Sequence, residues 1–170
     1  MRHPLSRTPA LAVLAGAALA ATGCGGGSTG LARGPSGQAI QARIAAPPDT
    51  VIQRAWETLR ADNITPRSFQ RAAGDTTNLA RMESEWIYLP NVFQSAPTQH
   101  LSEPEKYIKL LFWARPFRGG TTLYIEPVYT PAVMPTEPTN WARVRELPAA
   151  HPAWQYVDYM VDQLSRRLGE

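Results

Sequence analysis

Few side chains in this chain of 170 residues have the chemistry of a catalytic or covalently modified group. Cys24 is the single cysteine, and beyond the first 23 residues the imidazoles are His100 and His151. A nucleophilic mechanism needs a serine or cysteine beside a base and an orienting group. His100 follows a proline in an expected loop and His151 precedes Pro152 at an expected helix start, so we interpret both as exposed structural residues.

Two glutamates offer a second candidate for chemistry. Glu83 and Glu85 are two residues apart on one predicted strand face, a spacing that could form an acid/base pair. We instead expect a solvated sheet face whose acids pair with Lys106 or Lys109 on a neighbouring strand. No His, Cys or carboxylate spacing matches a metal site. The sequence therefore predicts no catalytic residues, no metal site and no cofactor, and we expect that the chain is not an enzyme.

The start of the chain has the three regions of a secretory signal. A basic segment precedes an apolar run over residues 11–21, and Thr22 and Gly23 lead to Cys24. The apolar run has eleven residues, whereas about 20 are needed to cross a bilayer. We therefore expect residues 1–23 to be a cleaved signal peptide and not a spanning helix.

The four residues that end at Cys24 resemble the lipobox of bacterial lipoproteins, although Ala21 stands where that family prefers leucine. The resemblance implies cleavage before Cys24 and acylation of its thiol, which together with an acylated amino terminus gives stable membrane anchoring. Gly25 takes the place of the aspartate that retains such lipoproteins in the inner membrane, so the resemblance implies the periplasmic face of the outer membrane. The alternative is a plain secreted protein that is cut near Ala18 or Ala21 and keeps a free thiol.

The mature chain, residues 24–170, is nearly neutral. Without Arg2 and Arg7 it has 15 basic residues against 14 acidic ones. This balance gives no support for a nucleic-acid partner or a polybasic membrane patch. Residues 24–37 contain six glycines and are expected to form a flexible tether, which leaves residues 38–170 for one folded domain.

The apolar periodicity of this domain predicts an α+β fold, an antiparallel sheet with an N-terminal helix and a long C-terminal helix packed on one face. Thr50 and Gln53 have the spacing of a capping box at the start of the first helix. We expect long proline-rich loops over residues 90–105 and 131–148. The expected strands cover residues 40–44, 66–72, 80–88, 106–114 and 121–130, and the expected helices cover residues 49–63 and 152–168. The expected buried stripe of the second helix is Trp154, Val157, Met160, Val161, Leu164 and Leu168.

This order of elements resembles a helix-grip domain. On a lipidated tether, residues 45–130 resemble BamC-type lipoproteins of the outer-membrane β-barrel assembly machine, in element order and in the run from Ala45 to Asp49 that leads into Trp56. That family carries two such domains and a longer N-terminal arm, where this chain has one domain. The resemblance implies a membrane-anchored protein with envelope proteins as its partners.

The tryptophans have two interpretations. Trp56, Trp86, Trp113 and Trp154 each fit a buried face, and we interpret them as core residues. Alternatively, they line a cavity between the sheet and the C-terminal helix that carries a lipid or another small apolar ligand.

One tryptophan fits no periodic face. Trp141 lies in the second proline-rich loop with Arg143 and Arg145, and these residue types are enriched in interface hot spots. We predict that these three residues bind a protein partner, although Trp141 could equally fasten the loop to the core. The predicted function is a non-catalytic, membrane-anchored envelope lipoprotein that acts as a protein-binding module in outer-membrane assembly or integrity.

Overall fold

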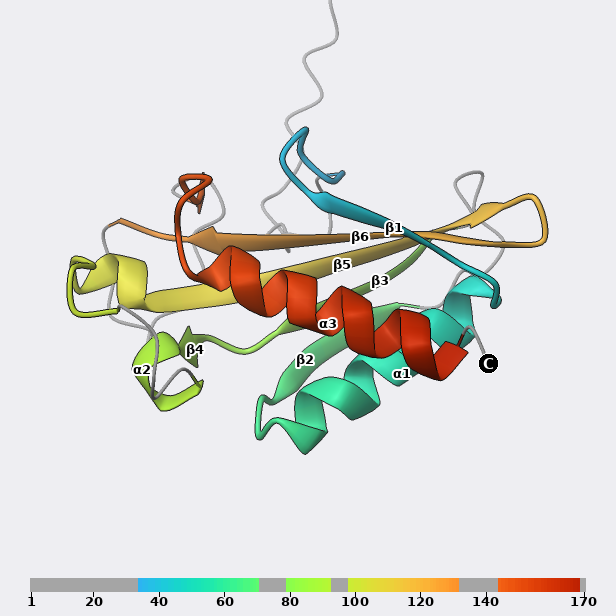
Figure 1. The fold of residues 1–170 in the computed structure, drawn as a ribbon, viewed down its shortest axis with the longest axis horizontal. Coiled ribbons are helices and arrows are strands. Elements are labelled where there is room, and N and C mark those ends of the chain that lie inside the picture. Colours follow the sequence, from blue (N-terminus) through green and yellow to red (C-terminus); the bar gives the residue numbers. More distant parts are fainter. Residues whose placement is uncertain (1–33, 71–78, 93–97, 132–143, 169–170) are drawn as a thin grey trace, which may run out of the picture.

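The computed structural model describes residues 34–70, 79–92, 98–131 and 144–168. In these residues an antiparallel sheet of seven strands is covered on one face by two long helices, α1 and α3 (Figure 1). This arrangement confirms the α+β class and the placement of both helices. The strands are β1 (Ile40–Ile44), β2 (Pro66–Gln70), β3 (Ala80–Ser84), β4 (Ile87–Tyr88), β5 (Tyr107–Phe117), β6 (Gly120–Tyr129) and β7 (Arg145–Glu146). The helices are α1 (Pro48–Ala61), α2 (Leu89–Val92), a short 3-10 turn at Pro104–Lys106, and α3 (Ala153–Leu168).

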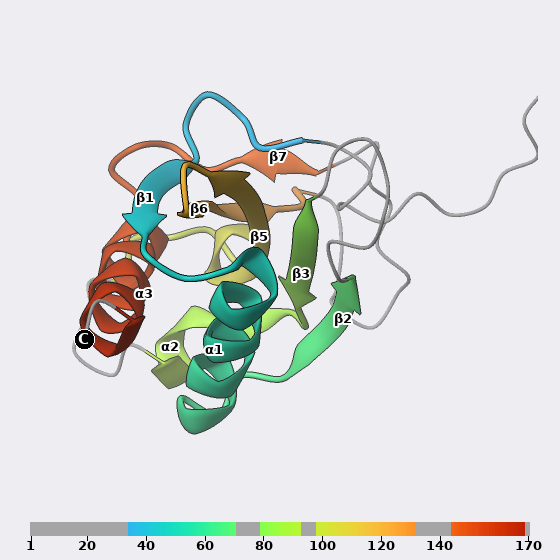
Figure 2. The same ribbon diagram turned by 90° about the vertical axis from the view of Figure 1, so that its right-hand side faces the viewer.

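The sheet has the strand order β1-β6-β5-β3-β2, with β4 paired to β5 and β7 paired to β6. The centre is the long β5–β6 hairpin, which closes at Arg118 (φ 36°) and Gly119 (φ 85°). Two consecutive positive φ angles give the turn the twist of the flanking strands. Seen from the side, the sheet curves, and α1 and α3 lie in its concave face (Figure 2). β1 and β2 are the two outer strands.

Helix α1 begins three residues earlier than a capping box with Thr50 as N-cap predicts. Its N-cap is Pro47, without a side-chain cap, and Pro48 is the first helical residue. Proline is favoured at this position because its φ angle is already helical, so Thr50 falls inside the first turn and the predicted capping box is wrong. The helix ends as expected at Asp62 and Asn63, and Asn63 has the positive φ of 58° that is typical of a helix terminus. Its buried face consists of Val51, Ile52, Ala55, Thr58 and Leu59.

Helix α3 fully buries three of the six residues of the predicted stripe, and the other three are half-buried. Val157, Met160 and Leu164 are fully buried, whereas Trp154 is half-buried and its Nε1 donates to the carbonyl oxygen of Pro148 at 3.0 Å. Tyr156 takes the buried position that the pattern assigned to Trp154. The core between the helices and the sheet is formed mainly by aliphatic and methionine side chains, and its buried aromatic residues are Phe112 and Tyr156.

The expected single strand from β3 through β4 is interrupted. Glu83 lies opposite Leu111 and Ile87 lies opposite Ile108, so this strand holds one more residue than β5 across the break. Such a bulge moves the following side chains to the other face of the sheet. As a result Ile87 joins the core between the sheet and the helices. Trp86, which strict alternation predicts on the core face, is not part of that core.

The face of the sheet that points away from the helices is also buried. Trp113 of β5 is fully buried there, in a cluster with Leu79, Leu111, Val128 and Val144. β5 is thus buried on both faces. The same face holds charged residues, and the buried Glu126 accepts a hydrogen bond from the backbone N–H of Ser36 at 3.1 Å.

Candidate functional site

The predicted modification and partner-binding residues are mostly outside the described part of the chain. Cys24, Trp141 and Arg143 lie outside the described residues. Arg145 is exposed in β7, where it lies opposite Tyr129 on β6. The prediction of a partner site at Trp141, Arg143 and Arg145 therefore stays a prediction, with only Arg145 placed.

The two histidines have different surroundings. His100 is exposed, as expected. His151 is only 5% exposed, so the expectation of an exposed residue was wrong. Its Nδ1 accepts from the backbone N–H of Ala153 at 3.2 Å, and its Nε2 donates to the carbonyl oxygen of Glu105 at 3.1 Å. Burial lowers the pKa of His151 below its ordinary 6.5, so the neutral ring serves as a cap at the start of α3.

Glu83 forms a buried ion pair with a lysine, whereas the partly exposed Glu85 pairs with an arginine. Glu83 Oε1 lies 3.8 Å from Lys109 Nζ and 3.9 Å from Arg67 Nε, while Glu85 contacts Arg67 at 3.7 Å. The predicted pairing with Lys109 is confirmed. The predicted solvation is wrong, because the side chains of Lys109 and Glu83 are 0% and 4% exposed. Trp86, displaced by the bulge, places its ring 5.3 Å from Lys109 Nζ as a cation–π partner.

Burial opposes both charges of this pair. It raises the pKa of Glu83, against the influence of Lys109 and Arg67. It lowers the pKa of Lys109, against the influence of Glu83. Perturbed pairs of this kind occur in active sites, but a general acid or base must come within hydrogen-bond reach of its substrate. Since neither side chain is open to solvent, the pair is suited to fixing β3 against β5 and not to catalysis.

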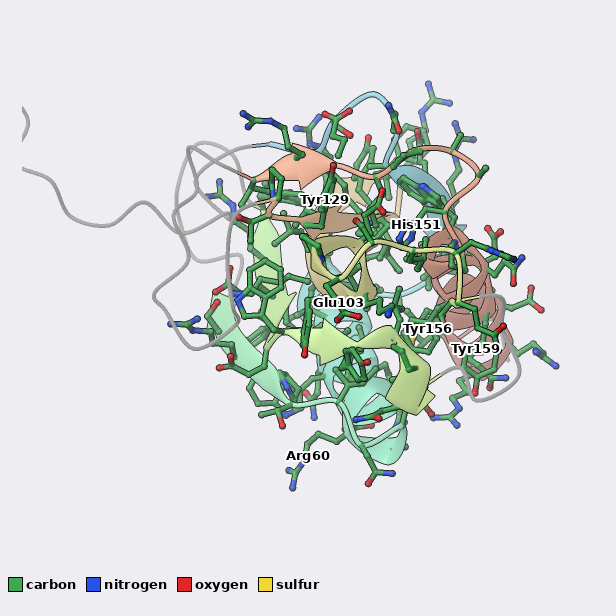
Figure 3. All side chains as sticks on the ribbon, turned by 90° about the vertical axis from the view of Figure 1, so that its left-hand side faces the viewer. Arg60, Glu103, Tyr129, His151, Tyr156 and Tyr159 are labelled. Atoms are coloured by element: carbon green, nitrogen blue, oxygen red, sulfur yellow. The ribbon has the colours of Figure 1, made fainter. Side chains whose placement is uncertain are left out.

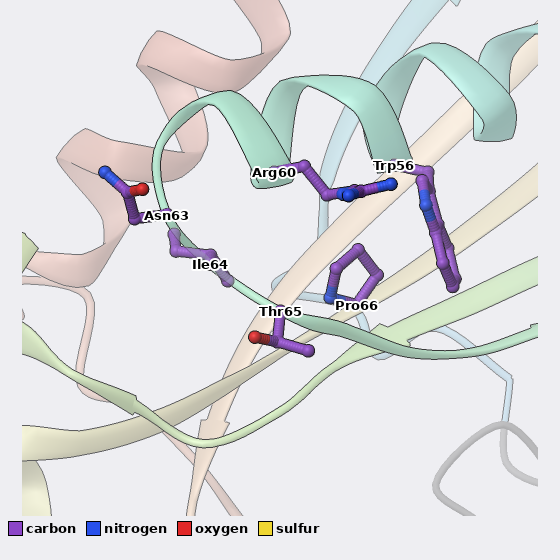
Figure 4. A pocket seen from close by; sticks show the side chains of 6 residues that line it. All are labelled: Trp56, Arg60, Asn63, Ile64, Thr65 and Pro66. Atoms are coloured by element: carbon purple, nitrogen blue, oxygen red, sulfur yellow. The ribbon is translucent and has the colours of Figure 1, made fainter.

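A groove lined by described residues runs between α1 and the outer strand β2, and we call it the α1–β2 groove. One part encloses about 450 Å³ and the other about 390 Å³. The two parts share Trp56 and Arg60, which project from α1 above Pro66 (Figure 4). The first part is completed by Asn63, Ile64, Thr65 and Pro66, and the second by Gln53, Glu57 and Phe69.

The apolar part of the groove is an aromatic pair. The rings of Trp56 and Phe69 are 6.4 Å apart at an interplanar angle of 65°, an edge-to-face contact. Both side chains are half-buried, so each packs on the core with one part and faces the groove with another. Pro66 at the start of β2 is buried beneath them.

The polar part of the groove carries an unneutralised positive charge. Glu57 is paired with Arg54 on the same helix, at 2.6 Å. Arg60 is exposed and forms no salt bridge within the described ranges. Beside it, β2 is hydrogen-bonded to β3 on one side, and no described strand pairs with its other side. The groove thus combines an apolar surface, a free guanidinium group and an open strand edge.

The sequence interpretation missed this groove because it assigned Trp56 to the core. A signal was available in the spacing, since Trp56 and Arg60 are four residues apart and so lie on the same side of α1. Trp56 lies at the border of the apolar stripe and is only half-buried. Phe69 and Pro66 come from a different element, and their approach to Trp56 needs the tertiary fold.

Comparison with protein-family models, with curated proteins and with solved structures finds no match. Neither fold relatives nor homologues therefore bear on the site, and the geometry stands alone. In the described ranges no group of three or more His, Cys, Asp or Glu side chains could hold a metal ion. Among the helices of these ranges, none combines the length and apolar character needed to cross a membrane.

Proposed function

We propose that this chain is a lipid-anchored, non-catalytic envelope protein whose folded domain binds other proteins. The anchor follows from the leader and from Cys24, which resemble a lipoprotein signal, and the same resemblance favours the periplasmic face of the outer membrane. Envelope proteins are then the partners within reach of the tether. The protein would serve in the assembly or integrity of that membrane.

The observation that carries the binding role is the α1–β2 groove. Tryptophan and arginine are the residue types most enriched in interface hot spots, and here Trp56 and Arg60 share one groove. An open strand edge beside a groove can accept an extended segment of another chain, with main-chain hydrogen bonds giving affinity and side-chain pockets giving specificity. The free guanidinium of Arg60 favours an acidic residue in that segment. The proposed ligand is thus an extended, acidic segment of a partner protein.

A ligand carrier on the same fold is supported less well. It requires space between the sheet and α3, where the side chains of Val157, Met160 and Leu164 are fully buried. Opposite them, Leu123 and Ile125 of β6 are fully buried as well. Close packing of this kind is what a binding module with an outer groove needs, because the groove must be held rigid.

Partner capture from crosslinked cells, with the lipid anchor intact, tests the groove. We expect Arg60→Ala to reduce capture by about tenfold, the effect of losing roughly 1.4 kcal/mol at a hot spot. Arg167→Ala is the matched control, because Arg167 is also an exposed arginine in the last turn of its helix. Equal capture by wild type, Arg60→Ala and Trp56→Ala, with both variants folded, would reject the groove. Loss of capture only in Trp141→Ala would move the site to the loop over residues 131–148.

The anchor is tested separately by Cys24→Ala. We expect this variant to lose acyl labelling and to leave the membrane fraction, because the thiol is the attachment point of the lipid. A variant that stays in the membrane fraction, together with a wild-type chain that takes up no lipid label, would contradict the localisation.

A further inference from the structure

A second hollow, of about 480 Å³, lies beyond the C-terminal end of α1, where α1 meets α2 and α3. It is lined by Asp62, Asn91, Val92, Tyr156 and Tyr159, and we call it the Asp62 pocket. Figure 3 shows Tyr156 and Tyr159 beside each other on α3, away from Arg60 of the α1–β2 groove. The two hollows have no lining residue in common.

The aromatic wall of the Asp62 pocket has one fixed ring and one open ring. The ring centroids of Tyr156 and Tyr159 are 5.9 Å apart, with an interplanar angle of 34°. Tyr156 is 4% exposed, and its hydroxyl donates to Asp62 Oδ2 at 2.8 Å. Burial raises the pKa of Tyr156, and the hydrogen bond to Asp62 raises it further, so the hydroxyl stays a donor. Tyr159 is 44% exposed, so part of its ring is open to a ligand.

Three features make the electrostatic environment of this pocket negative: the Asp62 carboxylate, the C-terminal end of α1 and an aromatic ring. Asp62 is the C-cap of α1, where the helix dipole places partial negative charge. The exposed ring of Tyr159 can offer the negative face of its quadrupole. Asp62 forms no salt bridge with any residue that the structure describes. A carboxylate at the negative end of a helix, beside two aromatic rings and without a basic partner, is an arrangement that a cation would stabilise.

We propose that the Asp62 pocket binds an arginine side chain of a partner protein. A planar guanidinium can stack on the open ring of Tyr159 while its N–H groups reach carboxylate and amide oxygens. Asp62 Oδ2 already accepts from Tyr156, which leaves Oδ1 for one donor, and the side-chain amide of Asn91 supplies a second acceptor in the same hollow. A quaternary ammonium group has no N–H to offer these oxygens, and a lysine ammonium cannot stack as a plane. The binding of arginine at this pocket does not depend on the α1–β2 groove.

The test is an NMR titration of the full-length chain with N-acetyl-arginine-N-methylamide. The matched ligand is N-acetyl-citrulline-N-methylamide, which has nearly the same shape and no charge. We expect saturable shifts of the Tyr159 ring and the Asn91 side-chain amide with the arginine compound only. The lysine analogue should bind more weakly, because it loses the stacking contact. Tighter binding of the lysine analogue, or equal binding of citrulline, would overturn the assignment.

Variants test whether the arginine compound binds in the Asp62 pocket. Asp62→Asn keeps an acceptor for the Tyr156 hydroxyl and removes the charge, and we expect it to lower the affinity for the arginine compound by about tenfold. Asp158→Asn is the control, since it removes an equal charge from an exposed site next to Tyr159. Equal losses in Asp62→Asn and Asp158→Asn would show a diffuse charge effect and refute the pocket. Arg60→Ala should leave this titration unchanged, so that failure of the groove and failure of the pocket are distinguishable.

Discussion

The buried ion pair between β3 and β5 predicts a large loss of stability when one partner is removed. In Lys109→Met the apolar part of the side chain is kept, and the carboxylate of Glu83 is left buried with only Arg67 near it, at 3.9 Å. In the wild type, Glu83 Oε2 accepts no hydrogen bond from the described residues. The variant therefore leaves a buried charge without its main partner, and it also removes the cation–π contact of Lys109 with Trp86.

The magnitude follows from the geometry. At the 3.8 Å between Lys109 Nζ and Glu83 Oε1, and with an effective dielectric constant of about 20, the attraction is about 4 kcal/mol. Removal of one partner from a buried pair typically costs about 3–5 kcal/mol, which agrees with this figure. Replacement of both residues, Glu83→Met with Lys109→Met, removes the desolvation of two charges together with their attraction. We expect the double variant to be within about 1 kcal/mol of the wild type.

The loss should depend on pH in a defined direction. Burial raises the pKa of Glu83 above its ordinary 4.5, and Lys109 is the strongest opposing influence. Without Lys109 the pKa rises further, so the native state holds the proton more tightly than the unfolded chain. Stability then falls as the pH rises from the unfolded pKa through the folded one. The cost of Lys109→Met is therefore smaller at about pH 5 than at about pH 8.

Urea unfolding of wild type, both single variants and the double variant at the two pH values measures these differences. A double-mutant cycle gives the coupling free energy of Lys109 and Glu83 directly. A loss below about 1 kcal/mol for Lys109→Met, or a loss independent of pH, would refute the reasoning, because it would mean that water reaches the pair.

Two further predictions concern Gly120 and His151. Gly120→Ala should destabilise the domain by about 1–3 kcal/mol, because its Cβ would lie 2.5 Å from the carbonyl oxygen of Ile44. Gly37→Ala, where a Cβ meets nothing within 4 Å, is the control, and equal melting temperatures of the two variants would contradict the close approach. His151 is uncharged in the fold and its pKa is lowered from 6.5, so wild-type stability should fall as the pH drops below about 6.5. His151→Asn, which keeps an acceptor for the N–H of Ala153, should flatten that slope in thermal unfolding, and an unchanged slope would exclude His151 as its source.

The parts of the fold that the sequence predicted are those that one element determines alone. The apolar spacing of Val157, Met160 and Leu164 specifies the inner face of α3 without knowledge of its neighbours. The continuous apolar run of β5 likewise indicates a central strand that is covered on at least one face. The bulge after β3 was missed because alternation continues through Glu85 and Trp86 in the sequence. Only the pairing with β5 shows that one residue there is extra.

The sequence predicts the burial of the charged residues and of His151 less well than that of the apolar residues. Sequence interpretation assigns Lys109 and Glu83 to solvent because charged residues are rarely buried unless they are paired. Their burial as a pair depends on how β3 and β5 are covered in the tertiary fold, which no local pattern gives. His151 was misplaced for a similar reason, since its burial depends on the carbonyl of Glu105, which is distant in the sequence.

The two candidate binding sites depend on charges that the fold keeps apart. Arg60 and Asp62 are two residues apart at the end of α1, and side chains at that spacing do not face each other on a helix. They cannot neutralise one another, so the helix end presents a guanidinium to the α1–β2 groove and a carboxylate to the Asp62 pocket. Trp56 with Phe69 on one side and Tyr156 with Tyr159 on the other supply an aromatic surface beside each charge. A single partner segment that passes the end of α1 could engage both hollows only if it carries two charged residues of opposite sign. The acidic residue would bind in the α1–β2 groove and the basic residue in the Asp62 pocket.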